Sequence, residues 1–170
     1  LRGRRATAIA PPATSAYRAV IATNPKMMDR YIITPAPARS NEEIACLAGA
    51  KAALHTWAAT VATRDVEAIL ALYAPDAILV PTLSNEVRDC QDSRREYFRN
   101  FLANEGLVCD VQIFKKRVSS KLSTVVVGGL YVFHYREGDA VVSVPARFLF
   151  TFEQIDGRWL ITGHHSSREA

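Results

Sequence analysis

The chain has 170 residues, of which 49% are apolar, and a formal net charge of +4 at pH 7. This length suits one domain with a sizeable core and an additional arm. No run approaches the roughly 18 uninterrupted apolar residues of a membrane span, so we expect a soluble protein with no membrane partner.

The positive charge belongs to the N-terminal segment. Residues 1–40 contain six Arg and one Lys against one Asp, so residues 41–170 carry a net charge of −2. The part of the chain that is expected to fold therefore gives no electrostatic reason to expect a nucleic acid partner.

Residues 1–40 are predicted to form a basic, Pro-rich arm. Five of the eight prolines lie there, and proline opposes both a packed helix and a central strand. An Arg-rich, acid-poor segment with Ala, Ser and Thr is typical of the remnant of an organelle transit peptide, and a linker between repeats fits it as well. Residues 41–170 are predicted to be a single domain.

Two helices are predicted after the arm. Ser40 and Glu43 have the spacing of a capping box, and the Ala-rich sequence that follows predicts a long helix over residues 41–63. Its expected apolar stripe is Ile44, Leu47, Leu54, Ala58 and Val61. Asp65 caps a shorter helix predicted over residues 66–73.

A strand is predicted over residues 77–80, followed by a third helix. Ser93 and Glu96 have capping spacing, and the helix carries Tyr97 and Phe98 on its apolar face before Gly106 ends it.

The second half of the domain is predicted to be a sheet. Runs of β-branched and aromatic residues separated by turn sequences predict consecutive strands over residues 108–119, 123–135, 140–153 and 158–167. The order of elements predicts an α+β fold, with a strongly curved antiparallel or mixed sheet wrapped as a cone around three N-terminal helices. Gly128 and Gly129 are interpreted as a bulge or bend that supplies curvature.

The last predicted strand ends in His164, His165, Ser166 and Ser167. Side chains alternate along a strand, so His164 and Ser166 share one face while His165 and Ser167 share the other. Either pair would bring an imidazole and a hydroxyl into an enclosed polar space. A two-residue turn at 156–157 places Arg147 opposite Ser166, but a bulge would exchange the faces, so the spacing leaves the inward pair open.

Other candidates lie near the expected cavity. Arg147 sits in an apolar run, where it either binds an anion or reaches solvent at a sheet edge. Thr82 and Ser84 follow a strand end, where loop residues can line a cavity mouth. The hydroxyl of Tyr97 needs a partner inside the core.

A metal site is not indicated. The adjacent His164 and His165 point to opposite faces, and no cluster of ligands at suitable spacing completes a tetrahedral site. Cys46, Cys90 and Cys109 lack CxxC spacing.

Several motifs together resemble a known family. The order of elements and the sequence from Asp156 to Ser167 resemble the nuclear-transport-factor-two-like cone fold, in the branch related to the calcium/calmodulin kinase association domain. Residues 79–85, Tyr97-Phe98, residues 144–148 and the His-His-Ser-Ser ending resemble the iota-class carbonic anhydrases. The resemblance covers about residues 41–167.

This resemblance implies reversible hydration of carbon dioxide to bicarbonate and a proton, without metal or other cofactor. Of the two His–Ser pairs, the resemblance favours His165 and Ser167. The catalytic residues that it implies are therefore Thr82, Tyr97, His165 and Ser167. The residues expected to bind the substrate, CO2 or bicarbonate, are Arg147, His164, Ser166 and Ser84. A homodimer through the sheet face is expected.

The location implied by the arm and by algal family members is the plastid, with the cytoplasm or periplasm of a bacterium as the alternative. Two other functions remain open. One is a non-catalytic association domain that only oligomerises. The other is a small-molecule isomerase or cyclase of the same fold, although such enzymes usually use a buried Asp or Glu as base.

Overall fold

The computed structural model describes residues 38–82 and 84–169. Residues from Arg39 onward form one compact unit. The predicted arm of residues 1–40 lies almost wholly outside the described residues and stays a prediction, as does the location that was inferred from it.

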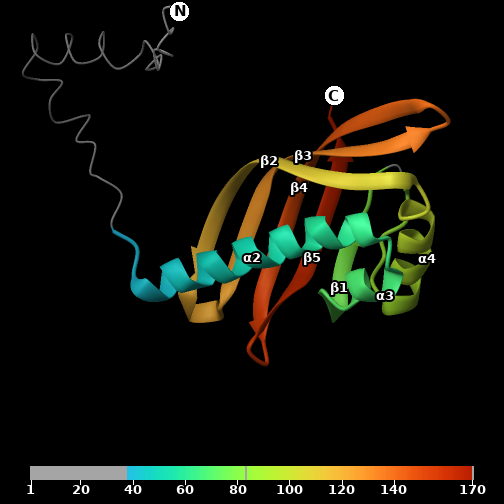
Figure 1. Cartoon of the computed structure of the whole chain (residues 1–170). Coiled ribbons are helices and arrows are strands. Elements are labelled where there is room, and N and C mark those ends of the chain that lie inside the picture. Colours follow the sequence, from blue (N-terminus) through green and yellow to red (C-terminus); the bar gives the residue numbers. More distant parts are fainter. Residues whose placement is uncertain (1–37, 83, 170) are drawn as a thin grey trace, which may run out of the picture. The chain divides into compact units, whose positions relative to one another are not determined.

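The unit contains three helices, a short 3-10 turn and five strands within the described residues (Figure 1). In chain order they are α2 (Asn41–Thr63), α3 (Val66–Leu70), β1 (Tyr73–Val80), α4 (Gln91–Phe101), β2 (Glu105–Ser119), η2 (Ser120–Leu122), β3 (Thr124–Glu137), β4 (Ala140–Ile155) and β5 (Arg158–Arg168).

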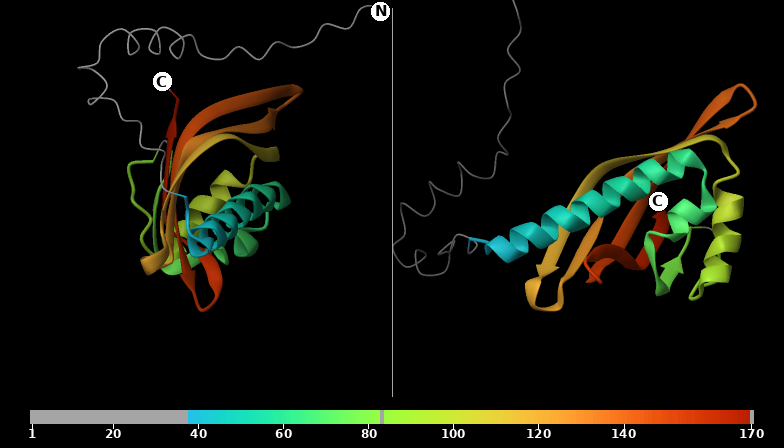
Figure 2. Two further views of the ribbon diagram at one scale, coloured as in Figure 1. Left: turned by 90° about the vertical axis from the view of Figure 1, so that its left-hand side faces the viewer. Right: turned by 60° about the horizontal axis from the view of Figure 1, so that its bottom comes forward.

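The strands form one mixed sheet in the order β1-β5-β4-β3-β2. Strands β2 to β5 pair as antiparallel neighbours, whereas β1 pairs parallel to β5. The sheet curves around the helices, which all lie on one of its faces (Figures 1 and 2). The predicted α+β cone is therefore confirmed.

Helix α2 has the predicted bounds because both ends are well specified. Ser40 and Glu43 form a complete capping box at its start, which typically stabilises a helix by about 1 kcal/mol. Arg64, in the left-handed conformation, ends it.

One stripe of α2 packs into the core, and its buried residues are Ala50, Leu54, Trp57 and Val61. The predicted stripe was wrong at Ile44, which is 55% exposed. By length and composition α2 could cross a membrane. The buried residues of α2 belong to the hydrophobic core of the domain, as expected for an amphipathic helix that packs on a sheet.

The predicted boundary between α3 and β1 was wrong. The helix ends at Leu70, and the strand already begins at Tyr73. The guanidinium of Arg94, 1% exposed, holds the irregular start of the strand by donating hydrogen bonds to the carbonyls of Ala74, Pro75 and Ala77. Tertiary contacts at β1 therefore override the local helical pattern.

The glycine pair does not form a bulge. Gly128 and Gly129 pair in regular register with both neighbouring strands. A Cβ on Gly128 would lie 3.1 Å from Leu149 Cδ1, so this glycine permits close side-chain approach instead. Register shifts occur elsewhere in the sheet, and they include one at Gln112, between β2 and β3, and one at Thr162, between β4 and β5.

Candidate functional site

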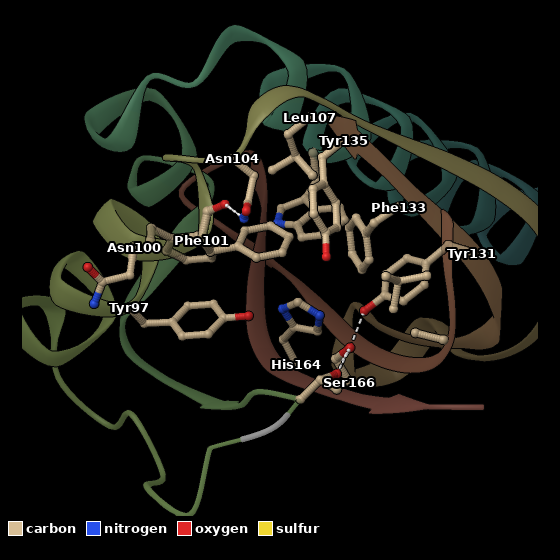
Figure 3. Close-up of a pocket in the computed structure, with 15 residues that line it drawn as sticks. Tyr97, Asn100, Phe101, Asn104, Leu107, Tyr131, Phe133, Tyr135, His164 and Ser166 are labelled. Atoms are coloured by element: carbon tan, nitrogen blue, oxygen red, sulfur yellow. Dashed lines mark hydrogen bonds between the residues drawn. The ribbon is translucent and has the colours of Figure 1, made fainter. Parts of the chain in front are cut away.

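A cavity of about 340 Å³ lies between α4 and the concave face of the sheet (Figure 3). Helix α4 supplies one wall because its apolar face carries Tyr97, Phe98 and Phe101 toward the sheet. The remaining lining residues are Trp57, Thr82, Asn100, Asn104, Leu107, Tyr131, Phe133, Tyr135, Val144, Ala146, His164 and Ser166.

The pair of β5 residues that faces this cavity is His164 and Ser166. Their side chains are 5% and 6% exposed, and they pair with the inward-facing Phe150 and Phe148. The structure therefore contradicts the preference for His165 and Ser167, which lie on the outer face of the sheet.

The extra residue in β5 explains why counting from the turn fails. The register shifts between Thr151 and Phe152 of β4, which leaves Thr162 unpaired in the ladder. Each residue of β5 beyond this point has the opposite orientation from that given by regular pairing, as a one-residue slip requires. Arg147 consequently lies opposite Ser167 and is exposed.

Two predicted substrate-binding residues thus lie outside the cavity. Arg147 reaches the outer surface, where its Nη2 lies 3.5 Å from the carbonyl oxygen of Arg168. Ser84 accepts a hydrogen bond from the backbone N–H of Glu86 and does not line the cavity. Turn formation accounts for the position of Ser84.

Thr82 and Ser166 belong to a chain of three hydroxyl groups (Figure 3). The hydroxyl of Tyr131 donates to Ser166 Oγ at 2.6 Å, and Ser166 Oγ lies 2.6 Å from Thr82 Oγ1. Val80, at the end of β1, pairs with His165, so the chain that follows β1 brings Thr82 beside Ser166. The three hydroxyl groups have three protons, and the two hydrogen bonds between them use two. One proton therefore remains to be donated to a molecule in the cavity.

The imidazole of His164 is held between aromatic rings. It stacks on Phe150 with ring centroids 3.9 Å apart, and Trp57 meets it edge-on at 5.2 Å. Burial, reinforced by repulsion from His165, lowers the pKa of His164 to about 3. His164 is therefore neutral near pH 7.

A second chain of polar groups leads from the core to His164. Trp57 Nε1 donates to the hydroxyl of Tyr73 at 3.0 Å, and this hydroxyl lies 2.8 Å from His164 Nδ1. Burial keeps the pKa of Tyr73 well above its usual value, so its hydroxyl stays protonated. His164 Nε2 is buried and has no hydrogen-bond partner among the described residues.

Tyr97 adds a further hydroxyl on the α4 side. Figure 3 shows it pointing toward His164. Burial raises its pKa to about 12, so it remains a neutral donor and acceptor. No residue in the described lining carries a formal charge near pH 7, since His164 is neutral. The site can therefore orient a small polar molecule by hydrogen bonds, between apolar walls.

The described residues assign no metal site. They contain no group of three or more His, Cys, Asp and Glu side chains that could hold an ion.

The structure thus brings together four predicted residues, Thr82, Tyr97, His164 and Ser166. Their catalytic or binding roles stay predictions. Trp57 and Tyr73 were not predicted to lie at this site, and Tyr131 was assigned to no site. The spacing of Trp57 from Leu54 and Val61 on α2 is a helical signal that could have placed it in the core, but nothing in the sequence pairs it with Tyr73.

The fold has many relatives among solved structures. A candidate scytalone dehydratase from Novosphingobium aromaticivorans shares 10% sequence identity with a TM-score of 0.69, over 78% of this chain and 89% of that protein. A candidate dehydratase of the NTF2-like family from Streptomyces avermitilis shares 12% identity with a TM-score of 0.67, over 75% and 98% of the two chains. At these identities the likeness establishes the fold alone.

Closer sequence similarity points to one branch of that fold. A protein from Xanthomonas campestris, described as a candidate calcium/calmodulin dependent protein kinase II association domain, is 34% identical with a TM-score of 0.64, over 79% of this chain and 91% of that protein. No curated protein sequence matches the chain. The resemblance to iota-class carbonic anhydrases finds no support in these comparisons and stays a prediction. Residues 50–170 match the calcium/calmodulin dependent protein kinase II association domain, and the chain belongs to that family.

Proposed function

We propose that this chain assembles with further copies of itself through the outer face of its sheet, and that the cavity in each copy binds a small molecule rich in hydrogen-bond acceptors. Membership of the association domain family is the observation that carries the assembly. A homodimer is the smallest assembly that would satisfy it.

The outer face of the sheet has the side chains that an interface needs. Ile78 on β1 and Leu149 on β4 are 50% and 49% exposed. The outward residues of β3, which alternate with its buried residues, include Val126, Leu130 and Val132. Apolar side chains that are left partly in water on one sheet face favour association with a complementary surface.

Sedimentation velocity tests the assembly. We expect wild-type protein to sediment as a dimer or larger species and Leu149→Glu to shift toward the monomer. Leu122→Glu is the matched control, because Leu122 is 72% exposed in η2, away from the sheet face. A monomeric wild type, or equal dissociation of both variants, would reject this interface.

The cavity provides the observation behind the second half of the proposal. The polar groups that line it are neutral, and its hydroxyl chain offers at least one unused proton to a bound molecule. Its walls are largely aromatic. A small molecule with oxygen acceptors satisfies the polar groups, and its remaining surface is buried against the rings.

Reversible hydration of carbon dioxide is the reaction that we propose for this cavity. The specific observation in its favour is the hydroxyl chain of Thr82, Ser166 and Tyr131 beside the free hydroxyl of Tyr97. Carbon dioxide is apolar and suits the aromatic walls. Thr82, Ser166 and Tyr97 would orient the attacking water and stabilise the charge that develops on the bicarbonate oxygens. The released proton would pass to solvent water.

A direct assay separates the two halves of the proposal. Hydration of CO2 is measured by stopped flow on protein purified in chelator and verified to lack zinc and manganese. Thr82→Ala, Tyr97→Phe and Ser166→Ala are expected to lose activity. Full activity in all three variants would reject this active site. An oligomer without turnover would leave the non-catalytic association domain as the function.

A further inference from the structure

The hydrogen bonds from Trp57 through Tyr73 to His164 determine which ring nitrogen of His164 carries the proton. The indole N–H of Trp57 can only donate, so the oxygen of Tyr73 accepts its hydrogen bond. The hydroxyl proton of Tyr73 then remains for the 2.8 Å contact with His164 Nδ1.

The opposite assignment is disfavoured by burial. A proton on His164 Nδ1 would make the Tyr73 oxygen accept two hydrogen bonds and leave its own proton without a partner among the described residues. Tyr73 is 5% exposed, and a buried donor without an acceptor costs about 1–3 kcal/mol. Nδ1 is therefore the acceptor, and the single proton of the neutral ring lies on Nε2.

We infer that Trp57 and Tyr73 are positioning residues that hold His164 with its proton on Nε2, so that His164 meets the ligand of the cavity as a hydrogen-bond donor. This inference rests on the proposed function and deepens it, since it says that the ligand must accept a hydrogen bond from His164. The unpartnered Nε2 of a side chain that is 5% exposed is the independent observation that points to such a ligand.

The donor role defines the ligand class. His164 and Ser166 lie two residues apart on one face of β5, a spacing of roughly 6.6 Å along a strand. The N–H of His164 and the unused proton of the hydroxyl chain can both donate to a small oxyanion or carbonyl compound between them. Within this arrangement His164 stabilises negative charge on the bound oxygen, and it does not remove the proton from water.

The stacked rings make the donor rigid. Phe150 at 3.9 Å and the edge of Trp57 at 5.2 Å fix the plane of the imidazole, while Tyr73 fixes its rotation. Trp57 thus contributes twice, by packing and by occupying the acceptor site of Tyr73. A preorganised donor loses little entropy when a ligand arrives.

Long-range proton–nitrogen NMR on 15N-labelled full-length protein tests the proton position. Wild-type His164, identified by its absence in His164→Asn, should show a protonated Nε2 and an unprotonated Nδ1. Tyr73→Phe should make the two nitrogen shifts converge, because both tautomers then become populated. Tyr131→Phe, a matched loss of one buried hydroxyl, should leave the His164 pattern unchanged.

Two results would overturn the inference. One is a wild-type His164 with its proton on Nδ1, which requires no variant to fold. The other is a Tyr73→Phe spectrum with the two shifts as well separated as in wild type, which would remove the positioning role.

Titration with sodium bicarbonate distinguishes this inference from the proposed function. Bicarbonate should shift the His164 Nε2 resonance of wild type, and its Kd should rise about two-fold in Tyr73→Phe if half of the rings then carry the proton on Nδ1. A correct tautomer without any shift on addition of bicarbonate would reject the proposed carbon dioxide chemistry while upholding the proton position.

Discussion

Three pairs of neighbouring identical residues divide between the inside and the outside of this domain. Arg94, His164 and Ser166 are buried, whereas Arg95, His165 and Ser167 are exposed or partly exposed. Each buried member has specific polar contacts in the interior. The comparison shows that residue type alone says little about function here, since one step along the chain changes the role entirely.

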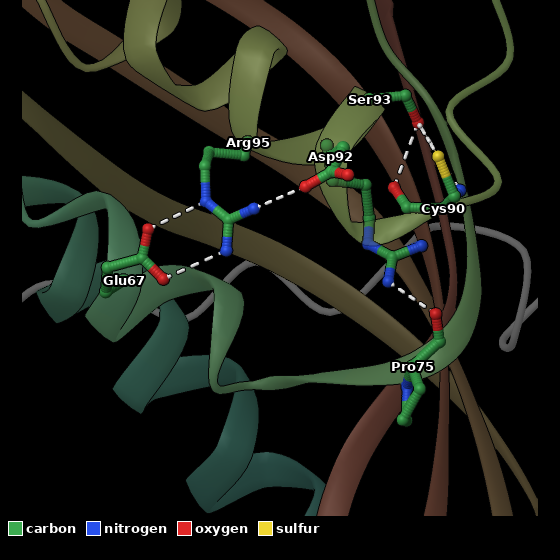
Figure 4. Close-up of polar contacts among 7 residues, drawn as sticks. Glu67, Pro75, Cys90, Asp92, Ser93 and Arg95 are labelled. Carbon is green, nitrogen blue, oxygen red and sulfur yellow. Dashed lines mark hydrogen bonds and ion pairs between the residues drawn. The ribbon is translucent and has the colours of Figure 1, made fainter.

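Backbone geometry causes the division. Adjacent residues of a helix point about 100° apart, so Arg94 faces β1, where it binds the strand's carbonyls. Arg95 instead reaches Glu67 and Asp92 at the surface (Figure 4). Adjacent residues of β5 point to opposite faces of the sheet.

The arginine pair should show the largest difference in stability. Arg94→Met removes a buried donor that serves three carbonyls of residues 74–77, two of them in buried hydrogen bonds, and we expect the free energy of unfolding to fall by about 3 kcal/mol. Arg95→Met removes ion pairs with the exposed carboxylates of Glu67 and Asp92, and it should have a much smaller effect that disappears at high salt. Urea denaturation measures both. Equal losses would contradict the structural role of Arg94.

The serine pair should separate in activity. If the cavity hydrates carbon dioxide, Ser166→Ala removes a preorganised hydrogen-bonding group, and kcat/KM should fall about 100-fold. Ser167→Ala should match wild type, because Ser167 lies on the outer face opposite Arg147. A loss in Ser167→Ala with an unaffected Ser166→Ala would show that the second pair faces the substrate.

The histidine pair should separate in pH dependence. The folded-state pKa of His164 is about 3, below the unfolded value of about 6.5, so the unfolded state binds more protons between these values. Neutral His164 therefore makes its full contribution to the free energy of unfolding above about pH 6.5. As pH falls below this value, the free energy of unfolding decreases by up to about 1.4 kcal/mol per pH unit.

Urea denaturation from about pH 6.5 to pH 5 isolates this effect, because carboxylates titrate mostly below that range. His164→Asn should flatten the dependence. His165→Asn should retain most of it, since burial is the larger cause of the low pKa and repulsion from His165 the smaller. An unchanged slope in His164→Asn would show that His164 is not the titrating group.

The general fold was predictable because its signals are local. The capping box of α2, the turn at residues 156–157 and the pattern of each helix and strand all lie within short segments. The set of Thr82, Tyr97, His164 and Ser166 was also named from the sequence, although the roles were divided differently.

The orientation of β5 was not predictable, because it depends on the extra residue at Thr162. Regular counting from the turn gives the wrong face, and no composition signal marks a bulge there. The partners of His164 were missed for a related reason. Trp57 and Tyr73 lie on α2 and β1, and only the closing of β1 against β5 brings the three together.

Two cavity tyrosines should show the smallest and most discriminating difference. The Tyr97 hydroxyl has no hydrogen bond to any described residue, whereas Tyr131 donates to Ser166 at 2.6 Å. Tyr97→Phe should therefore leave the free energy of unfolding nearly unchanged, while Tyr131→Phe should lower it by about 1 kcal/mol.

If Tyr97 binds the substrate water, its variant should still lose about ten-fold in CO2 hydration, close to 1.4 kcal/mol of transition-state stabilisation. Urea denaturation and stopped flow on the same two variants measure these changes. A Tyr97→Phe protein that is both as stable and as active as wild type would mean that this hydroxyl only fills space and takes no part in the reaction.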